Sequence, residues 1–250
     1  QVYVKSVTDS LEEYCAPAYY ITPPLDDSDN NVIYINERNS PQNLELYTTL
    51  AHEGFPGHLY QTVYHNYEMY GEKDNYVRQI LWHGGYQEGW ALYVEFLSFA
   101  YAQDLLSEAG YPELAPAVAF ERHSRSLLLC LYSLLDIMIH YENASYETIK
   151  EVLELCGITG ETSINTVYTY LVEEPANYLK YYLGYLEILS LQNEAKTLWG
   201  DQYSDYAFHT FFLECGPSDF VTIEIELAKS DVQKYISVKK AGLSEITLHN

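Results

Sequence analysis

The chain has 250 residues, of which 48% are hydrophobic, so it can bury a sizeable core and is not intrinsically disordered. Its 36 acidic residues against 13 basic ones give a formal net charge of −23, which argues against nucleic acid or an anionic membrane surface as a partner. No apolar stretch reaches about 18 residues, so we expect no membrane span. The four cysteines form no C-x-x-C pair, which argues against a cysteine zinc site or a dithiol redox motif.

The first 40 residues read as a lead-in of strands and loops. Residues 2–7 alternate weakly, as a strand does, residues 10–15 look helical, and residues 20–29 contain two adjacent prolines that indicate a loop. Residues 31–36 are a short β-type run. A strand before a metal-binding helix can offer its free edge to an extended substrate, so this run is a candidate peptide-binding edge, with an ordinary edge strand as the alternative.

Pro41 is expected to open a helix that leads into segment 52–58, which reads His-Glu-Gly-Phe-Pro-Gly-His. Two histidines with a carboxylate between them supply the ligands and the base of a hydrolytic zinc site. In the common motif His-Glu-x-x-His the histidines share one helix face, but His52 and His58 are six residues apart, which on an unbroken helix turns them about 240° away from each other. The Pro-Gly pair permits a kink that would bring both imidazoles to one ion. The alternative is a helix broken at Pro56, with two unrelated surface histidines.

A second motif lies about 30 residues downstream, in segment 85–95, which reads as helical from Glu88 onward. A carboxylate on a following helix completes a zinc site with three protein ligands and leaves the fourth position for water. Glu88 is therefore the predicted third ligand. Glu95 lies two turns further on nearly the same face, so it is an alternative ligand or a partner that orients a ligand histidine. For Glu95 we favour a solvent-exposed helix face.

Together, His-Glu-x-x-Pro-Gly-His and Glu-Gly-Trp-Ala-x-Tyr-x-Glu resemble the bacterial domain-of-unknown-function 885 family (DUF885), itself similar to the thermostable-carboxypeptidase group of zinc peptidases. The resemblance implies a mainly α, zincin-like metallopeptidase domain with a few short β-strands near its N-terminus and with Zn²⁺ as cofactor. Family members carry a long helical region before these motifs. We therefore expect one catalytic-type domain equivalent to the C-terminal half of a longer protein, with the lead-in at 1–40, the motif-bearing helices at 41–110 and a helical remainder at 111–250.

The helical remainder begins with a long helix expected over residues 111–140. Asp136 and His140 are four residues apart and share a face, so His140 is a candidate to orient substrate or a ligand, with a surface ion pair as the alternative. Arg122 or Arg125 could bind a substrate carboxylate through two hydrogen bonds, although a structural salt bridge is the favoured interpretation in so acidic a chain.

Later segments add further candidates. Cys130 lies in an apolar run and is expected to be a buried thiol. Ser145 is expected to cap a helix that ends near residue 156. The family pattern Tyr-x-x-Gly falls on Tyr181, and a Phe-His pair places a histidine at His209. Both are candidate donors to the oxyanion of peptide hydrolysis, with aromatic packing as the alternative for Tyr181. Further helices are expected over residues 162–172, 205–213 and 219–229.

The sequence thus predicts a zinc-dependent, carboxypeptidase-like hydrolase that acts on a peptide or small amide substrate. His52, His58 and Glu88 would hold Zn²⁺, and Glu53 would act as general base toward water and then protonate the leaving amine. Two alternatives remain open: a metallohydrolase of non-peptide amides or esters, and a non-catalytic binding module with a degenerate metal site. A secreted or cell-surface location and a cytoplasmic one both stay open, as does the oligomeric state.

Overall fold

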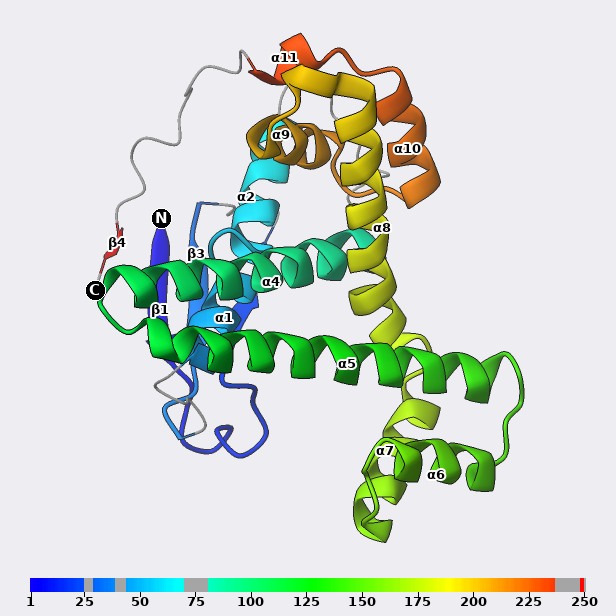
Figure 1. The fold of residues 1–250 in the computed structure, drawn as a ribbon. Coiled ribbons are helices and arrows are strands. Elements are labelled where there is room, and N and C mark those ends of the chain that lie inside the picture. Colours follow the sequence, from blue (N-terminus) through cyan, green and yellow to red (C-terminus); the bar gives the residue numbers. More distant parts are fainter. Residues whose placement is uncertain (25–28, 39–43, 70–80, 237–247, 250) are drawn as a thin grey trace.

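A computed structural model describes residues 1–24, 29–38, 44–69, 81–236 and 248–249. The molecule is mainly helical with a small sheet near its N-terminus, as predicted (Figure 1). Its helices are Leu44–Glu53 (α1), His58–Met69 (α2), Gly84–Glu108 (α4), Ala115–His140 (α5), Tyr146–Leu155 (α6), Glu161–Glu173 (α7), Asn177–Trp199 (α8), Asp205–Cys215 (α9), Phe220–Ala228 (α10) and Val232–Ile236 (α11), with 3-10 turns at Pro112–Leu114 and Gly200–Gln202. Among the described residues, no helix is long and apolar enough to cross a membrane.

The sheet has the strand order β2-β3-β1-β4, formed by Ala18–Ile21, Asn31–Ile35, Val2–Ser6 and Leu248–His249. β3 runs parallel to β1 and antiparallel to β2, with Tyr20 opposite Ile33. The predicted strand at 31–36 therefore exists, but the prediction that it offers a free edge is wrong, because both of its edges are paired. Among the described strands, the outer ones are β2 and β4, so β2 keeps one unpaired edge.

Two other expectations for the lead-in are also wrong. Residues 10–15 form successive turns instead of a helix, and the Nδ2 amide of Asn36 donates to the carbonyls of Glu12 and Cys15, at 2.8 and 2.9 Å. Residues 20 and 21 belong to β2 instead of a loop, because β3 supplies their hydrogen-bonding partners. The expected helix opening at Pro41 lies outside the described residues, and α1 is described from Leu44.

α4 is the central helix and is apolar on nearly every side, since five consecutive residues, Trp90 to Val94, are buried. It packs against α1, α5 and α8 (Figure 1). Where α4 crosses α8, a Cβ atom on Gly89 would lie 2.5 Å from the backbone of Gly184. The two helices therefore touch through their backbones, which requires glycine at this position.

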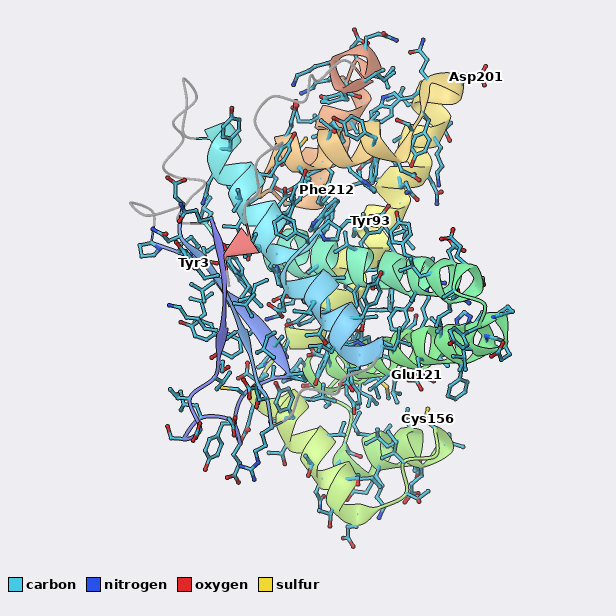
Figure 2. All side chains as sticks on the ribbon, turned by 90° about the vertical axis from the view of Figure 1, so that its left-hand side faces the viewer. Tyr3, Tyr93, Glu121, Cys156, Asp201 and Phe212 are labelled. Carbon is cyan, nitrogen blue, oxygen red and sulfur yellow. The ribbon has the colours of Figure 1, made fainter. Side chains whose placement is uncertain are left out.

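Three groups of buried side chains hold the described part of the chain together. The largest lies among α4, α5, α8, α9, α10 and α11, and Figure 2 shows two of its members, Tyr93 and Phe212. A second group lies among α5, α6 and α7, and a third between the sheet and α2. Ser145 caps α6 as predicted, since its hydroxyl accepts a hydrogen bond from the Thr148 amide at 3.2 Å.

Cys130 is exposed, so the prediction of a buried thiol is wrong. α5 buries the face that carries Leu129 and Ser133, and Cys130 is rotated about 100° from Leu129. The apolar run around Cys130 therefore includes residues outside the buried face of α5.

Candidate metal centre

The two motif histidines are separated by a helix break. α1 ends at Glu53, α2 begins at His58, and the four residues between them turn the chain. A Cβ atom on Gly57 would lie 1.7 Å from the carbonyl oxygen of His52, so only glycine permits this close return. The indole Nε1 of Trp90 donates to the Pro56 carbonyl at 2.9 Å and ties the turn to α4.

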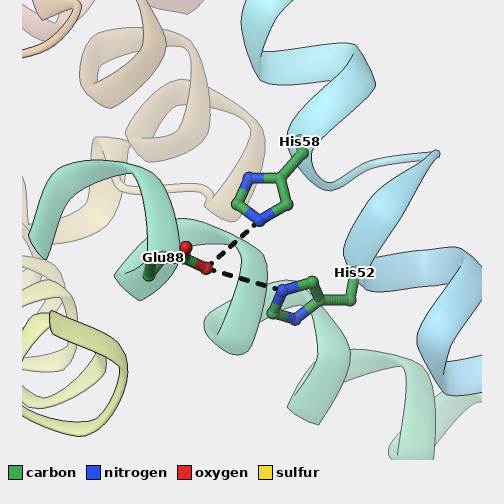
Figure 3. Close-up of side chains that lie close together, drawn as sticks. All are labelled: His52, His58 and Glu88. Carbon is green, nitrogen blue, oxygen red and sulfur yellow. Dashed lines mark ion pairs between the residues drawn. The ribbon is translucent and has the colours of Figure 1, made fainter. Parts of the chain in front are cut away.

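This break brings the two imidazoles together, with ring centroids 4.8 Å apart. Glu88 reaches between them from α4 (Figure 3). Its Oε2 lies 3.2 Å from His58 Nε2 and 3.7 Å from His52 Nε2. The three side chains offer ligand atoms that all lie within 4.8 Å of one another. The helix is broken between the two histidines, as one alternative predicted. The two imidazoles nevertheless lie side by side, and His52 is buried.

Glu95 lies behind His52, and the expectation of an exposed position is wrong because it is only 5% exposed. Its Oε2 is 2.9 Å from His52 Nδ1, and its Oε1 accepts from Arg125 Nε at 3.0 Å. Burial alone would raise the pKa of Glu95, but these partners hold it below its usual value. The Arg125 pair also confirms the structural salt bridge favoured for that arginine.

The donor set fits Zn²⁺. Two imidazole nitrogens and one carboxylate oxygen are typical ligands, and with bonds of about 2.0–2.1 Å the edges of a tetrahedron measure about 3.3 Å. The separations of Glu88 Oε2 from the two histidines are close to that value. Glu88 Oε2 is also buried without a hydrogen-bond partner, which is costly unless a cation or proton meets it. With Nδ1–H donating to Glu95, His52 presents the lone pair of Nε2 toward the same point.

The protonation of the metal-free centre supports the same arrangement. Burial alone would lower the pKa of His52, but its contacts with Glu88 and Glu95 outweigh burial and raise that pKa to about 9. Burial likewise opposes ionisation of Glu88, and the two histidines nevertheless hold its pKa well below the usual value. The metal-free protein therefore keeps a proton where the donor atoms converge, and a divalent cation would replace it.

Glu53 directly follows His52 and is the last residue of α1. Its Oε2 accepts a hydrogen bond from the backbone N–H of Tyr20 in β2, at 2.9 Å. Within the described part of the chain, Oε1 accepts no hydrogen bond. The free edge of the sheet thus fixes this carboxylate through one oxygen and leaves the other available.

Tyr181 is also brought to the centre. Its ring stacks on His52 with centroids 6.3 Å apart. Burial, followed by the charge and hydrogen bonding of Glu88, raises the pKa of Tyr181 well above its usual value. Tyr181 therefore keeps its hydroxyl proton and can donate it in a hydrogen bond.

His140 and His209 lie elsewhere. Nε2 of His140 is 2.9 Å from the carbonyl oxygen of Leu171, because the end of α5 packs on α7 in the second buried group. Asp136 does not fix the His140 tautomer, since both of its oxygens accept from the Ala176 amide, at 2.9 and 3.1 Å. His140 therefore contacts α7, and no contact in the described part of the chain joins it to the three candidate ligands.

The ring of His209 contacts members of the first buried group from α9. Its Nε2 is 2.9 Å from the hydroxyl of Tyr93, which accepts a hydrogen bond from Gln192. Burial lowers the pKa of His209. The ring contacts Trp90 and Tyr93 on α4, and among the described contacts none joins it to the three candidate ligands. Tyr181 is thus the better-placed oxyanion donor.

A cavity of about 860 Å³ opens beside the centre. β2 and its lead-in, α1, α4, α5, α7 and α8 contribute to its walls. Its lining residues are Ala16, Pro17, Ala18, Leu44, Glu45, Thr48, Thr49, His52, Glu53, Glu95, Phe99, Glu121, Ser124, Arg125, Leu128, Leu129, Tyr170, Asn177, Tyr178 and Tyr181.

The Glu95 contact is the part of the site that the sequence interpretation undervalued. A signal was present, because Glu95 is an isolated carboxylate within an apolar helical stretch, and such a group is buried only with partners. The position of Tyr20 beside Glu53 left no comparable signal, because it acts through its backbone.

A family model described as "Bacterial protein of unknown function (DUF885)" matches residues 1–221. The putative lipoprotein from Colwellia psychrerythraea has a similar crystal structure, with 27% identity and a TM-score of 0.69, over 92% of this chain and 38% of that one. A putative lipoprotein of unknown function from Shewanella oneidensis shares the fold at 21% identity and a TM-score of 0.68, over 91% of this chain and 40% of that one. None of the curated proteins matches. The chain thus spans about two fifths of the length of these solved relatives.

Proposed function

Since this chain belongs to DUF885, a family of bacterial proteins of unknown function, we propose from its site that it is a zinc-dependent hydrolase of peptide bonds. One observation carries the proposal. His52, His58 and Glu88 present three ligand atoms within 4.8 Å of one another, and the carboxylate of Glu53 directly follows the first of them. Two histidines, a carboxylate and a separate general base are the groups that hydrolytic zinc sites use.

Each residue around the centre has a separate role in the proposed reaction. Zn²⁺ held by the three ligands would polarise the scissile carbonyl and make a water molecule more acidic. Glu53 takes the proton from the attacking water and passes it to the leaving amine. Its bond to the Tyr20 amide holds one oxygen, so the free Oε1 performs the transfer. Tyr181 donates a hydrogen bond to the carbonyl oxygen as negative charge develops there.

The cavity supports a peptide as substrate. Ala18 lines it, and this residue lies on β2, the edge strand of the sheet. Among the described strands, β2 pairs with β3 alone, so its other side offers backbone groups to an extended chain. The free edge ends beside Glu53, where the amide of Tyr20 already donates to that carboxylate. A peptide bound along β2 would therefore reach the base.

The test is Glu53→Gln, assayed with a mixed library of short peptides and by elemental analysis. We expect the variant to keep wild-type zinc and to lose at least about 100-fold in kcat, because general acid–base catalysis contributes about 10²–10⁴-fold. Glu154→Gln is the control, since Glu154 lies on α6 in a surface pair with Lys150. Full turnover by Glu53→Gln would overturn the mechanism. Turnover of esters or small amides without peptides would move the assignment to the first alternative.

A further inference from the structure

The cavity beside the centre carries an unusual distribution of charge. Four glutamates line it, whereas Arg125 is its only lysine or arginine among the lining residues of the described chain. The Arg125 side chain is 41% exposed, so it is open to the cavity. An anionic group of a ligand would therefore meet one suitable partner.

The guanidinium is fixed and only partly used. Nε donates to Glu95 Oε1 at 3.0 Å, and within the described residues its two Nη nitrogens make no hydrogen bond. A guanidinium has five donors in a planar fork, and the outer pair of nitrogens matches the two oxygens of a carboxylate. Because Glu95 holds the inner edge, the outer edge is already oriented for such a ligand.

Arg125 also lies at a defined place relative to the metal ligands. Glu95 binds Arg125 with one oxygen and His52 with the other. The arginine is therefore separated from the centre by one carboxylate and one imidazole. An extended chain advances about 3.3–3.6 Å per residue, so a carboxylate on Arg125 belongs to a residue one or two positions after the scissile bond.

We propose that Arg125 binds the free C-terminal carboxylate of the peptide, and that the protein removes one or two residues from that end. This inference rests on the proposed peptidase function and names its substrate class. Leu128 and Leu129 follow Arg125 by three and four residues on α5 and line the same cavity, together with Tyr178. The terminal side chain would meet this wall, so apolar C-terminal residues are preferred.

The experiment measures binding instead of turnover. Zinc-loaded Glu53→Gln protein is titrated with a short peptide ending in phenylalanine, once as the free acid and once as the C-terminal amide. We expect the free acid to bind at least about 10-fold more tightly, because a charge-assisted pair of hydrogen bonds is lost in the amide. Adding Arg125→Met should reduce the difference to less than about two-fold. Arg122→Met is the matched control, since Arg122 lies one turn away over the Phe96 ring and does not line the cavity.

Zinc content is measured for each variant, because Arg125 also contacts Glu95. If Arg125→Met loses zinc, Arg125→Lys is used instead, because lysine keeps the charge without the planar fork. The Arg125→Lys variant must then show a smaller difference in affinity between acid and amide than the parent does. Equal binding of acid and amide by the parent, or unchanged discrimination in the Arg125 variants, overturns the carboxylate site alone. Binding of neither peptide overturns the proposed function as well.

Discussion

At the scale of single residues, the centre depends on a chain of contacts that runs from Arg125 through Glu95 to His52. Glu95 carries a charge in a buried position, and this is tolerated because a guanidinium and an imidazole N–H both donate to it. The contact to Nδ1 also sets which His52 nitrogen is free to bind a metal. Glu95 is therefore a positioning residue for the proposed zinc site.

Glu95→Gln should weaken zinc binding by about 10–100-fold, because the amide is a weaker acceptor and no longer favours one tautomer of His52. Competition with a chelator of known affinity measures the change. Glu226→Gln, in a surface pair with Lys229, is the control and should bind zinc like the wild type. Unchanged zinc affinity in Glu95→Gln would show that the contact is structural only.

The protonation of His52 gives a pH-dependent prediction. Its pKa is raised to about 9 in the metal-free protein, because contacts with Glu88 and Glu95 outweigh burial. The resulting stabilisation is fully present below the unfolded value of about 6.5 and is lost as pH rises through about 9. Zinc binds neutral imidazole, so binding at pH 7.5 should release about one proton from His52.

Titration calorimetry in two buffers of different ionisation enthalpy counts these protons. The His52 contribution to this release should disappear above about pH 10, where His52 is already neutral in the metal-free protein, which leaves only the proton lost by zinc-bound water. Equal apparent enthalpies in the two buffers at pH 7.5 would contradict the protonation described for the centre.

At the scale of secondary-structure elements, the decisive feature is the turn between α1 and α2. The spacing of six residues between His52 and His58 suggested either a kinked helix with one metal site or a broken helix with two separate histidines. The structure combines a break with a cluster in which both histidines lie beside Glu88, because the turn reverses the chain within four residues. Its anchor, Trp90 on α4, lies 34 residues from Pro56, so local spacing could not decide between the alternatives.

Gly57→Ala tests this turn. A Cβ atom there would lie 1.7 Å from the His52 carbonyl oxygen, so the backbone must move. We expect a loss of about 3 kcal/mol or more in the free energy of unfolding, together with weaker zinc binding. Chemical denaturation and zinc titration measure the two effects.

Gly160→Ala is the matched control for this variant. Gly160 has a negative φ at the start of α7, and an added Cβ would make only ordinary contacts, 3.4 Å or longer. Wild-type stability and zinc affinity in Gly57→Ala would show that the close return of the chain is not required.

At the scale of the whole molecule, the sequence predicted best what local patterns determine. The helical class, the helix over 111–140 and the Ser145 cap follow from periodicity and capping chemistry, and all three are present. The exposed position of Cys130 and the paired edges of β3 could not be predicted in this way. Both depend on which faces of neighbouring elements pack, and that is a property of the assembled fold.

The candidate site shows the same division. His52, His58 and Glu88 were identified from residue types and spacing, because the chemistry of a metal site restricts both. His209 was a reasonable candidate by the same standard, yet α9 packs so that its ring meets Tyr93 on α4. Sequence spacing within one helix carries no information on which partner helix its side chains will contact.

The walls of the cavity come from β2, α1, α4, α5, α7 and α8, so the site depends on most of the described fold. The chain nevertheless spans only about two fifths of the solved relatives that it resembles. The substrate class proposed from the cavity concerns the residues of this part of the fold, and the three residues of the proposed metal centre all lie within it.

The most direct measurement is the zinc content of protein purified without chelator, determined by elemental analysis. We expect about one zinc per chain for the wild type and its loss in His58→Ala. His123→Ala is the control, since His123 is exposed on α5, and it should keep the metal. A wild type without zinc after exposure to the ion, or a His58→Ala variant with full zinc, would contradict the assignment of His52, His58 and Glu88 as a metal site.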